Sequence, residues 1–165
     1  TVAASLEAMK DAALILGREE VGETLLEGLT ERIGKVESAL ASRTTPAPRV
    51  LRIMNWNPLI SVGPGSFQHD VIGMAGGRNI MGDALAPYLV CSPELAAERN
   101  PQVIFFCEPH LVDVLHRDPT WQEVEAVREN KIFVFDCGLT CRSGPRIVDM
   151  LEGLATVLYP KLFQR

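Results

Sequence analysis

Three sets of residues could support chemistry, and a glycine-rich loop is the first of them. The segment Gly63-Pro64-Gly65-Ser66 precedes a helical pattern, as a phosphate-binding loop would. A dinucleotide fingerprint would need a third glycine at position 68, where the chain has Gln68, and a Walker loop would need a lysine that is absent here. We therefore expect the glycines to turn the chain and Ser66 to cap the following helix.

The second set is the four cysteines, which do not form paired C-x-x-C motifs. Cys91 and Cys107 lie in apolar, strand-like runs and are expected to be buried thiols. Cys137 and Cys141 flank the loop Cys-Gly-Leu-Thr-Cys. This spacing is compatible with a local disulfide, with two free thiols, or with half of a metal site.

The third set consists of partial enzyme motifs. The segment CRSGPR at residues 141–146 has one residue too few between Cys and Arg for a cysteine-phosphatase loop, and its proline removes a donor N–H. His69, His110 and His116 lie far apart, and only His110 follows a predicted strand. We can pair no nucleophile with a base, so we expect no catalytic residue, cofactor or metal. One enzyme alternative stays open: a Rossmann-like or flavodoxin-like protein with a metal or nucleotide near Cys137, Cys141 and His110.

The elements that must position these residues alternate along most of the chain. Residues 2–42 form a helical segment interrupted at Gly17, and the proline-containing linker SRTTPAPR follows at 42–49. Apolar runs then predict strands at 50–54, 88–91, 102–107 and 131–136. Helical patterns lie between them, at 66–75, 92–98, 110–116 and 120–130, and a last one begins at Pro145. This order predicts an α/β fold with three layers, in which helices cover both faces of a mainly parallel sheet.

Charge and composition exclude several partner classes. The 165-residue chain fits one domain, its net charge is −5, and no stripe of Lys or Arg indicates a nucleic acid or an anionic membrane surface. No apolar run reaches the roughly 18 residues that a membrane span needs. Thr1 already lies in a helical pattern, with no initiator Met or signal peptide, so we expect a processing boundary there. A scaffold that binds through the long N-terminal helix is a third hypothesis.

In such a sheet, ligands bind beyond the carboxyl ends of the strands. Four predicted connections meet at that edge: Asn55-Trp56-Asn57, the segment around 88–92, Glu108-Pro109-His110, and the loop at 137–144. Together they bring two Asn, a Trp, a Tyr, a His and an Arg to one rim.

Several segments, in order and spacing, resemble the class III substrate-binding proteins of ABC importers, which capture cobalamin, haem or ferric siderophores. These segments are NPLISVGPGSFQHDVIGMAGGRNI, VCSPELAAERNPQVIFF, TWQEVEAVRENKIFVFD and SGPRIVDMLEGLATVLYP. The resemblance implies that residues 49–165 form the C-terminal α/β lobe and that residues 1–42 form the helical segment between two lobes. The N-terminal lobe of that family has no counterpart here, so the ligand wall is expected to be open. The cobalamin-binding branch is the most similar one.

The resemblance also implies a site and a partner. The ligand is expected to be a corrinoid, haem or ferric siderophore, and the chain is expected to act in the periplasm or outside the cytoplasmic membrane without inserting into it. Glu94 falls where the family has a glutamate that docks onto arginines of the membrane permease. The expected ligand-binding residues are Asn55, Trp56, Asn57, Tyr88, Leu139, Thr140, Cys141 and Arg142.

Overall fold

The computed structural model describes residues 1–163, and a four-stranded parallel sheet lies at its centre. The strands are β1 (Arg49–Arg52), β3 (Arg78–Asn79), β5 (Val103–Phe106) and β6 (Ile132–Val134), in the order β3-β1-β5-β6. Strand β1 pairs with both β3 and β5, and β5 pairs with β6. All four residues of β5 are buried, as expected for a strand covered on both faces.

A second, antiparallel sheet corrects part of the predicted strand order. The run predicted to be extended at 88–91 forms β4 (Tyr88–Val90), which pairs with β2 (Ile60–Val62) outside the main sheet. The sequence reading missed β3, the remaining strand of the main sheet, because it has only two residues. Strand β4 has exposed residues at both ends and a half-buried one between them, so it does not have the apolar surroundings of a central strand.

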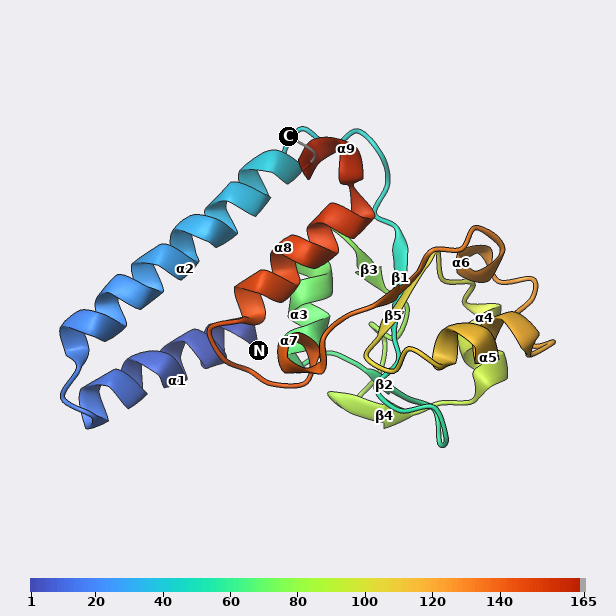
Figure 1. Ribbon diagram of the computed structural model, residues 1–165, viewed down its shortest axis with the longest axis horizontal. Helices are drawn as coiled ribbons and strands as arrows, with labels where there is room; N and C mark the ends of the chain where they lie inside the picture. Colours follow the sequence, from blue (N-terminus) through green and yellow to red (C-terminus); the bar gives the residue numbers. More distant parts are fainter. Residues whose placement is uncertain (164–165) are drawn as a thin grey trace.

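Helices cover both faces of the parallel sheet, which confirms the predicted three-layer α/β fold (Figure 1). The helices α2 (Glu19–Leu40), α3 (Phe67–Met74) and α8 (Ile147–Leu158) lie on one side, where Val50 and Phe105 share their apolar core. The opposite side carries α4 (Pro93–Glu98), α5 (Leu111–Arg117) and α6 (Glu125–Arg128). There Leu51 and Phe106 pack in a second core around the fully buried Trp121. Successive residues of a strand thus pack into the cores on opposite faces of the sheet.

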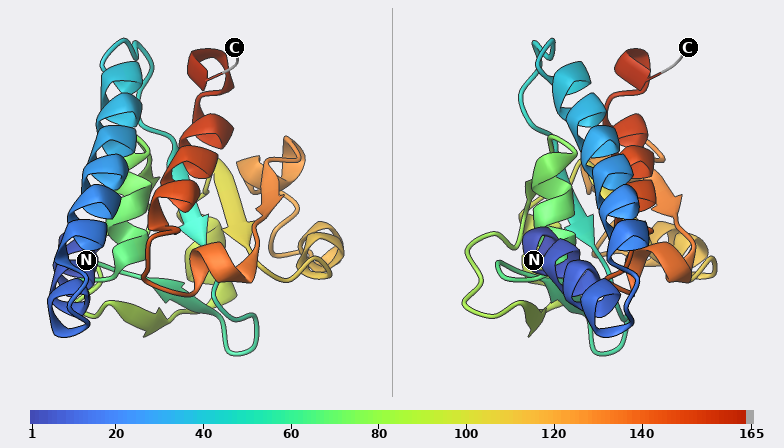
Figure 2. Two further views of the ribbon diagram at one scale, coloured as in Figure 1. Left: turned by 60° about the vertical axis from the view of Figure 1, so that its left-hand side comes forward. Right: turned by 90° about the vertical axis from the view of Figure 1, so that its left-hand side faces the viewer.

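The N-terminal segment forms a helical hairpin of α1 (Val2–Ile15) and α2, as the sequence predicts (Figure 2). Gly17 at the bend has φ +60°, which glycine adopts at low cost. Arg32 fastens α2 to α8, since its guanidinium lies 2.5 Å from Asp149 and 2.6 Å from Glu152. The buried apolar residues of this hairpin include Val2, Leu29 and Val36, which pack against the lobe. Towards the tip of the hairpin five apolar residues are exposed: Leu14, Ile15, Leu16, Val21 and Leu25.

The other helices follow the predictions with three differences. Ser66 caps α3 by accepting from the His69 N–H, and Ser92 caps α4 by accepting from Leu95 N–H, both as predicted. Only α6 is helical within the helix predicted at 120–130. The residues before it form a turn in which the Asp118 carboxylate accepts from Thr120 N–H. Two short helices, α7 (Cys137–Thr140) and α9 (Pro160–Phe163), were not predicted. Within residues 1–163, no helix combines the length and the hydrophobicity that a membrane crossing requires.

Candidate functional site

The candidate site lies at the carboxyl edge of the parallel sheet. In the left view of Figure 2, β1 and β5 point down towards α7 and the β2–β4 pair. Four connections leave the sheet at this edge: residues 53–57 after β1, residues 80–87 after β3, residues 107–110 after β5, and residues 135–142 after β6. The segment around Tyr88, expected as a fourth strand end, instead belongs to the antiparallel pair, because β4 runs against β2.

The Asn55-Trp56-Asn57 segment forms a tight connection between β1 and β2. The Asn55 side chain donates to Pro58 O at 2.8 Å, and its backbone forms a bridge with Ile60. Trp56 is half-buried, with its ring centroid 5.9 Å from that of Trp121. Asn57 is exposed and precedes a cis proline. Trp56 therefore packs against the second core and keeps a smaller part of its surface accessible.

The Leu139–Arg142 segment contains side chains with different exposures. The Asp136 carboxylate caps α7 by accepting from Gly138 N–H at 2.7 Å. Leu139 is half-buried against the first core, and Thr140 is fully buried. Cys141 and Arg142 are exposed, and within residues 1–163 Arg142 has no ion-pair partner. No hydrogen bond of the described residues joins this segment to Asn55, Trp56 or Asn57.

Arg52 is a functional candidate that sequence reasoning missed. It is 0% exposed, and its guanidinium lies over the Phe105 ring at 5.3 Å. One terminal nitrogen donates to Ile53 O, and the other donates to Thr140 Oγ1 at 3.2 Å and to Cys107 Sγ at 3.1 Å. The signal in the sequence was an arginine inside the apolar run Val-Leu-Arg-Ile-Met. A buried cation needs a partner, which a core strand does not supply by itself.

Three cysteines converge beside Arg52, and their grouping corrects two expectations. Cys107 is half-buried and not a core thiol, and its Sγ lies 3.4 Å from Cys141 Sγ. Cys137 Sγ joins them, all three sulfur atoms being within 4.8 Å of one another. Cys107, and not His110, therefore completes the group with Cys137 and Cys141. His110 is instead exposed, with Nε2 3.6 Å from Glu108. All four cysteines are free thiols, and Cys91 is buried elsewhere, as expected.

Two thiols of the cluster, Cys107 and Cys137, differ in how readily they ionise. Burial alone would raise the pKa of Cys107, but the hydrogen bond from Thr140 and the Arg52 charge outweigh it, so the pKa is lowered. Hydrogen bonding to Cys107, together with burial and the neighbouring sulfur charges, raises the pKa of Cys137 to about 12. The Thr140 hydroxyl and the Arg52 guanidinium thus both favour the thiolate form of Cys107, whereas the Cys137 thiol stays protonated at neutral pH.

The glycine-rich loop and the Gly-Gly-Arg-Asn segment have structural roles. Gly63 approaches the backbone so closely that an added Cβ would lie 2.4 Å from Ala86 O. The buried Asn79 side chain donates to Val62 O at 2.8 Å, and its Oδ1 accepts from Met81 N–H at 3.0 Å. These contacts join β3 to β2, so we infer that the loop shapes the antiparallel pair.

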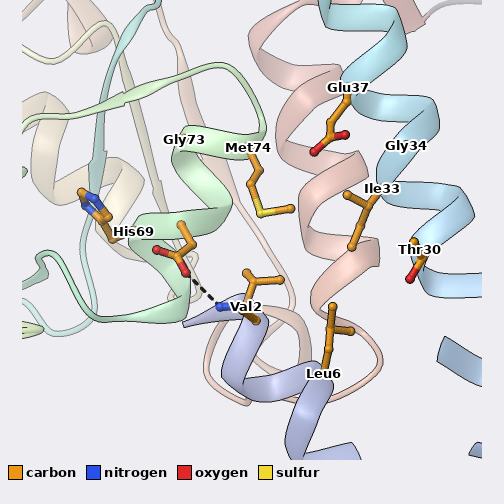
Figure 3. A pocket seen from close by; sticks show the side chains of 11 residues that line it. Val2, Leu6, Thr30, Ile33, Gly34, Glu37, His69, Gly73 and Met74 are labelled. Carbon is orange, nitrogen blue, oxygen red and sulfur yellow. Dashed lines mark hydrogen bonds between the residues drawn. The ribbon is translucent and has the colours of Figure 1, made fainter. Parts of the chain in front are cut away.

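A groove lies away from the strand edge, between α1, α2 and α3 (Figure 3). Its volume is about 740 Å³, and the side chains of Leu6, Ile33 and Met74 line it. Val2 N–H donates to the Asp70 carboxylate at 2.9 Å, which ties the start of α1 to α3.

Glu94, the expected docking residue, is exposed in the first turn of α4, on another part of the surface.

Comparison with known proteins identifies the family. Residues 1–137 match the model of the periplasmic binding protein family. The vitamin B12-binding protein of Vibrio cholerae is 29% identical over 140 residues, which is 84% of this chain and 50% of that protein. The chain thus spans about half the length of this curated relative.

Solved structures share the fold over nearly the whole chain. The periplasmic vitamin B12-binding protein of Vibrio cholerae has a TM-score of 0.83 at 25% identity, covering 100% of this chain and 64% of that one. A periplasmic haem-binding protein from Roseiflexus has a TM-score of 0.84 at 24% identity, covering 98% and 64%. At that identity the second likeness shows the fold alone. These relatives are binding proteins, and nothing in the comparisons supports the enzyme alternative. The chain belongs to the periplasmic binding protein family, and its resemblance to the class III proteins of ABC importers is confirmed for part of their length.

Proposed function

We propose that this chain supplies one lobe, together with the interlobe helices, of a protein that captures cobalamin or another metal chelate for an ABC importer. One observation carries the proposal: the whole chain superposes on part of a vitamin B12-binding protein. In this proposal residues 1–42 connect the lobes, residues 49–165 form the C-terminal lobe, and the ligand contacts the carboxyl edge of the sheet.

Trp56 is the proposed anchor for the flat part of the ligand. Trp121 is fully buried behind it, so the Trp56 ring is already held before a ligand arrives. A preorganised aromatic ring gives a large apolar contact while losing little conformational entropy. We propose that Asn55 and Asn57, on either side of it, supply polar contacts at the same rim.

Arg142 and Tyr88 are proposed to contact other parts of the ligand. Arg142 is exposed and has no ion pair within residues 1–163, so its five N–H donors are available for a propionate, phosphate or carboxylate. Tyr88 is 49% exposed on β4, which leaves part of its ring open to a ligand. The Leu139-Thr140-Cys141 backbone would form the wall beside Arg142.

Glu94 is the proposed contact with the permease. It occupies the second position of α4, where the helix N-terminus stabilises a carboxylate and Ser92 and Pro93 fix its place. An exposed, fixed charge sets the orientation and rate of docking more than the final affinity. This role places the chain outside the cytoplasmic membrane, as in other periplasmic binding proteins.

Calorimetric titration tests the ligand assignment. The polypeptide carrying this chain and a second lobe is titrated with cyanocobalamin, hemin and a ferric hydroxamate. We expect one chelate to bind, and Arg142→Ala to weaken it when the ligand carries an acidic group. Arg117→Ala is the matched control, because Arg117 is also exposed but lies in the last turn of α5. No heat with any of the three chelates would contradict the proposal.

A further inference from the structure

The three-cysteine cluster has the dimensions of a metal site. A tetrahedral ion bound by thiolates has metal–sulfur bonds of about 2.3 Å, which places its sulfur ligands about 3.8 Å apart. Cys107 and Cys141 have their sulfur atoms 3.4 Å apart, and all three sulfur atoms fall within 4.8 Å. Small side-chain rotations are therefore enough to place them at three corners of a tetrahedron.

The fold brings these thiols together from two strand ends. Cys107 directly follows β5, whereas Cys137 and Cys141 begin and follow the single turn of α7 after β6. A spacing of four residues puts two side chains on the same face of a helix, and here that face meets Cys107. Cys137 and Cys141 are exposed, so an ion can reach the cluster from solvent.

Arg52 provides an independent indication that this place holds negative charge. It is fully buried, and no carboxylate among residues 1–163 lies within ion-pair distance of its guanidinium. Its terminal nitrogen is aimed at the cluster, 3.1 Å from Cys107 Sγ and 3.6 Å from Cys141 Sγ. Buried charges are normally paired. A divalent ion with three thiolates has a net charge of −1, which balances one guanidinium.

Three converging thiols fit a small ion better than the metal of a macrocycle. The equatorial positions of a haem or corrin metal are filled by its own ring nitrogens, so only one axial position faces the protein on each side. One thiolate would be enough to fill that axial position, and the other two cysteines would not bind the metal. A single ion uses all three and keeps a fourth position for water or another donor.

We propose that Cys107, Cys137 and Cys141 form a three-thiolate site for a thiophilic divalent cation such as Zn²⁺ or Cd²⁺. On binding, the thiols that are still protonated release their protons to solvent, three metal–sulfur bonds form, and a water molecule occupies the open position. The site faces the same edge of the sheet as the proposed chelate wall, to which Cys141 contributes its backbone, and the ion needs no chelate in order to bind.

Cobalt(II) is the probe for a direct test. The untagged chain is reduced under anaerobic conditions, its four free thiols are confirmed, and it is titrated with Co²⁺. We expect thiolate-to-cobalt charge-transfer absorption and the intense visible bands of a tetrahedral centre, saturating at one ion per chain. Added Zn²⁺ or Cd²⁺ should displace the cobalt and abolish these bands.

Single substitutions assign the ligands. Cys137→Ser and Cys141→Ser change exposed positions, so folding should persist, as circular dichroism can verify; each should lower metal affinity by at least about 10-fold. Cys91→Ala is the matched control, because the buried Cys91 thiol lies in the second core, around Trp121. This variant should bind the metal as tightly as the unmodified chain does. Equal losses in all three variants would overturn the site.

The titration also separates an ion from the metal of a chelate. Hemin and cyanocobalamin are added in parallel to the same reduced chain. Absence of the cobalt(II) bands would overturn the proposal. If a thiolate-ligated haem spectrum appeared in its place and disappeared in Cys141→Ser, the cysteines would instead belong to chelate binding. Failure of cobalamin capture alone would leave the cobalt(II) result unaffected, so the two proposals fail separately.

Discussion

Asn79→Ala tests whether the Gly-Gly-Arg-Asn segment is structural. The substitution removes the Nδ2 donor to Val62 O and the Oδ1 acceptor of Met81 N–H, at a side chain that is 8% exposed. Each buried group left without a partner costs about 1–3 kcal/mol, so two of them should lower the free energy of unfolding by about 3 kcal/mol. For a chain of this size, that corresponds to a fall in Tm of about 6–12 °C.

Urea denaturation followed by far-ultraviolet circular dichroism measures this loss. Asn55→Ala is the matched control, because the Asn55 side chain also donates to a backbone carbonyl at 2.8 Å, but at an exposed site where water replaces the bond. We expect it to cost no more than about 1 kcal/mol. If the two substitutions cost the same, burial does not control the energy of these bonds and the structural role assigned to Asn79 is wrong.

Three further predictions concern packing, the ligand and the importer. Gly63→Ala should cost about 1–3 kcal/mol in urea denaturation, because its Cβ would meet Ala86 O at 2.4 Å, whereas Gly28→Ala in open space on α2 should stabilise the chain by about 0.5–1 kcal/mol. Equal effects would show that the close approach is not rigid. Trp56→Ala should weaken chelate binding by more than about 1 kcal/mol by calorimetry, and an unchanged affinity would remove Trp56 from the site. Glu94→Arg should reduce ligand-stimulated ATP hydrolysis by the reconstituted importer while leaving chelate affinity unchanged; full stimulation would refute the docking role.

The sequence was sufficient to predict three of the four strands of the parallel sheet, β1, β5 and β6, because their signals are local. The continuous apolar run of β5 and the capping serines at positions 66 and 92 depend only on neighbouring residues. The second sheet depends on pairing between Ile60–Val62 and Tyr88–Val90, which neither segment specifies alone. Strand β3 escaped prediction because two residues show no periodicity.

The cysteine cluster could be predicted only in part, for a similar reason. The four-residue spacing of Cys137 and Cys141 indicated two neighbouring thiols, but Cys107 comes from a strand end 30 residues earlier along the chain. Its apolar surroundings indicated burial, and the pairing of β5 with β6 decided where its sulfur lies. Arg52 in an apolar strand was the one local sign that a polar partner exists nearby.

The separation of the β2–β4 pair from the main sheet has an evolutionary consequence. It is fastened through β2, where Ser61 donates to Arg52 O at 2.7 Å and Asn79 donates to Val62 O. Within residues 1–163, no hydrogen bond joins residues 84–86 of the loop before Tyr88 to the parallel strands, and Leu85 is fully exposed. Among homologues the side chain at position 85 can therefore vary at little cost to folding, whereas Ala86 and Pro87 are held by Gly63 and Asp83 is paired with Arg99. Substituting Leu85 is accordingly the place to begin when redesigning what this lobe recognises.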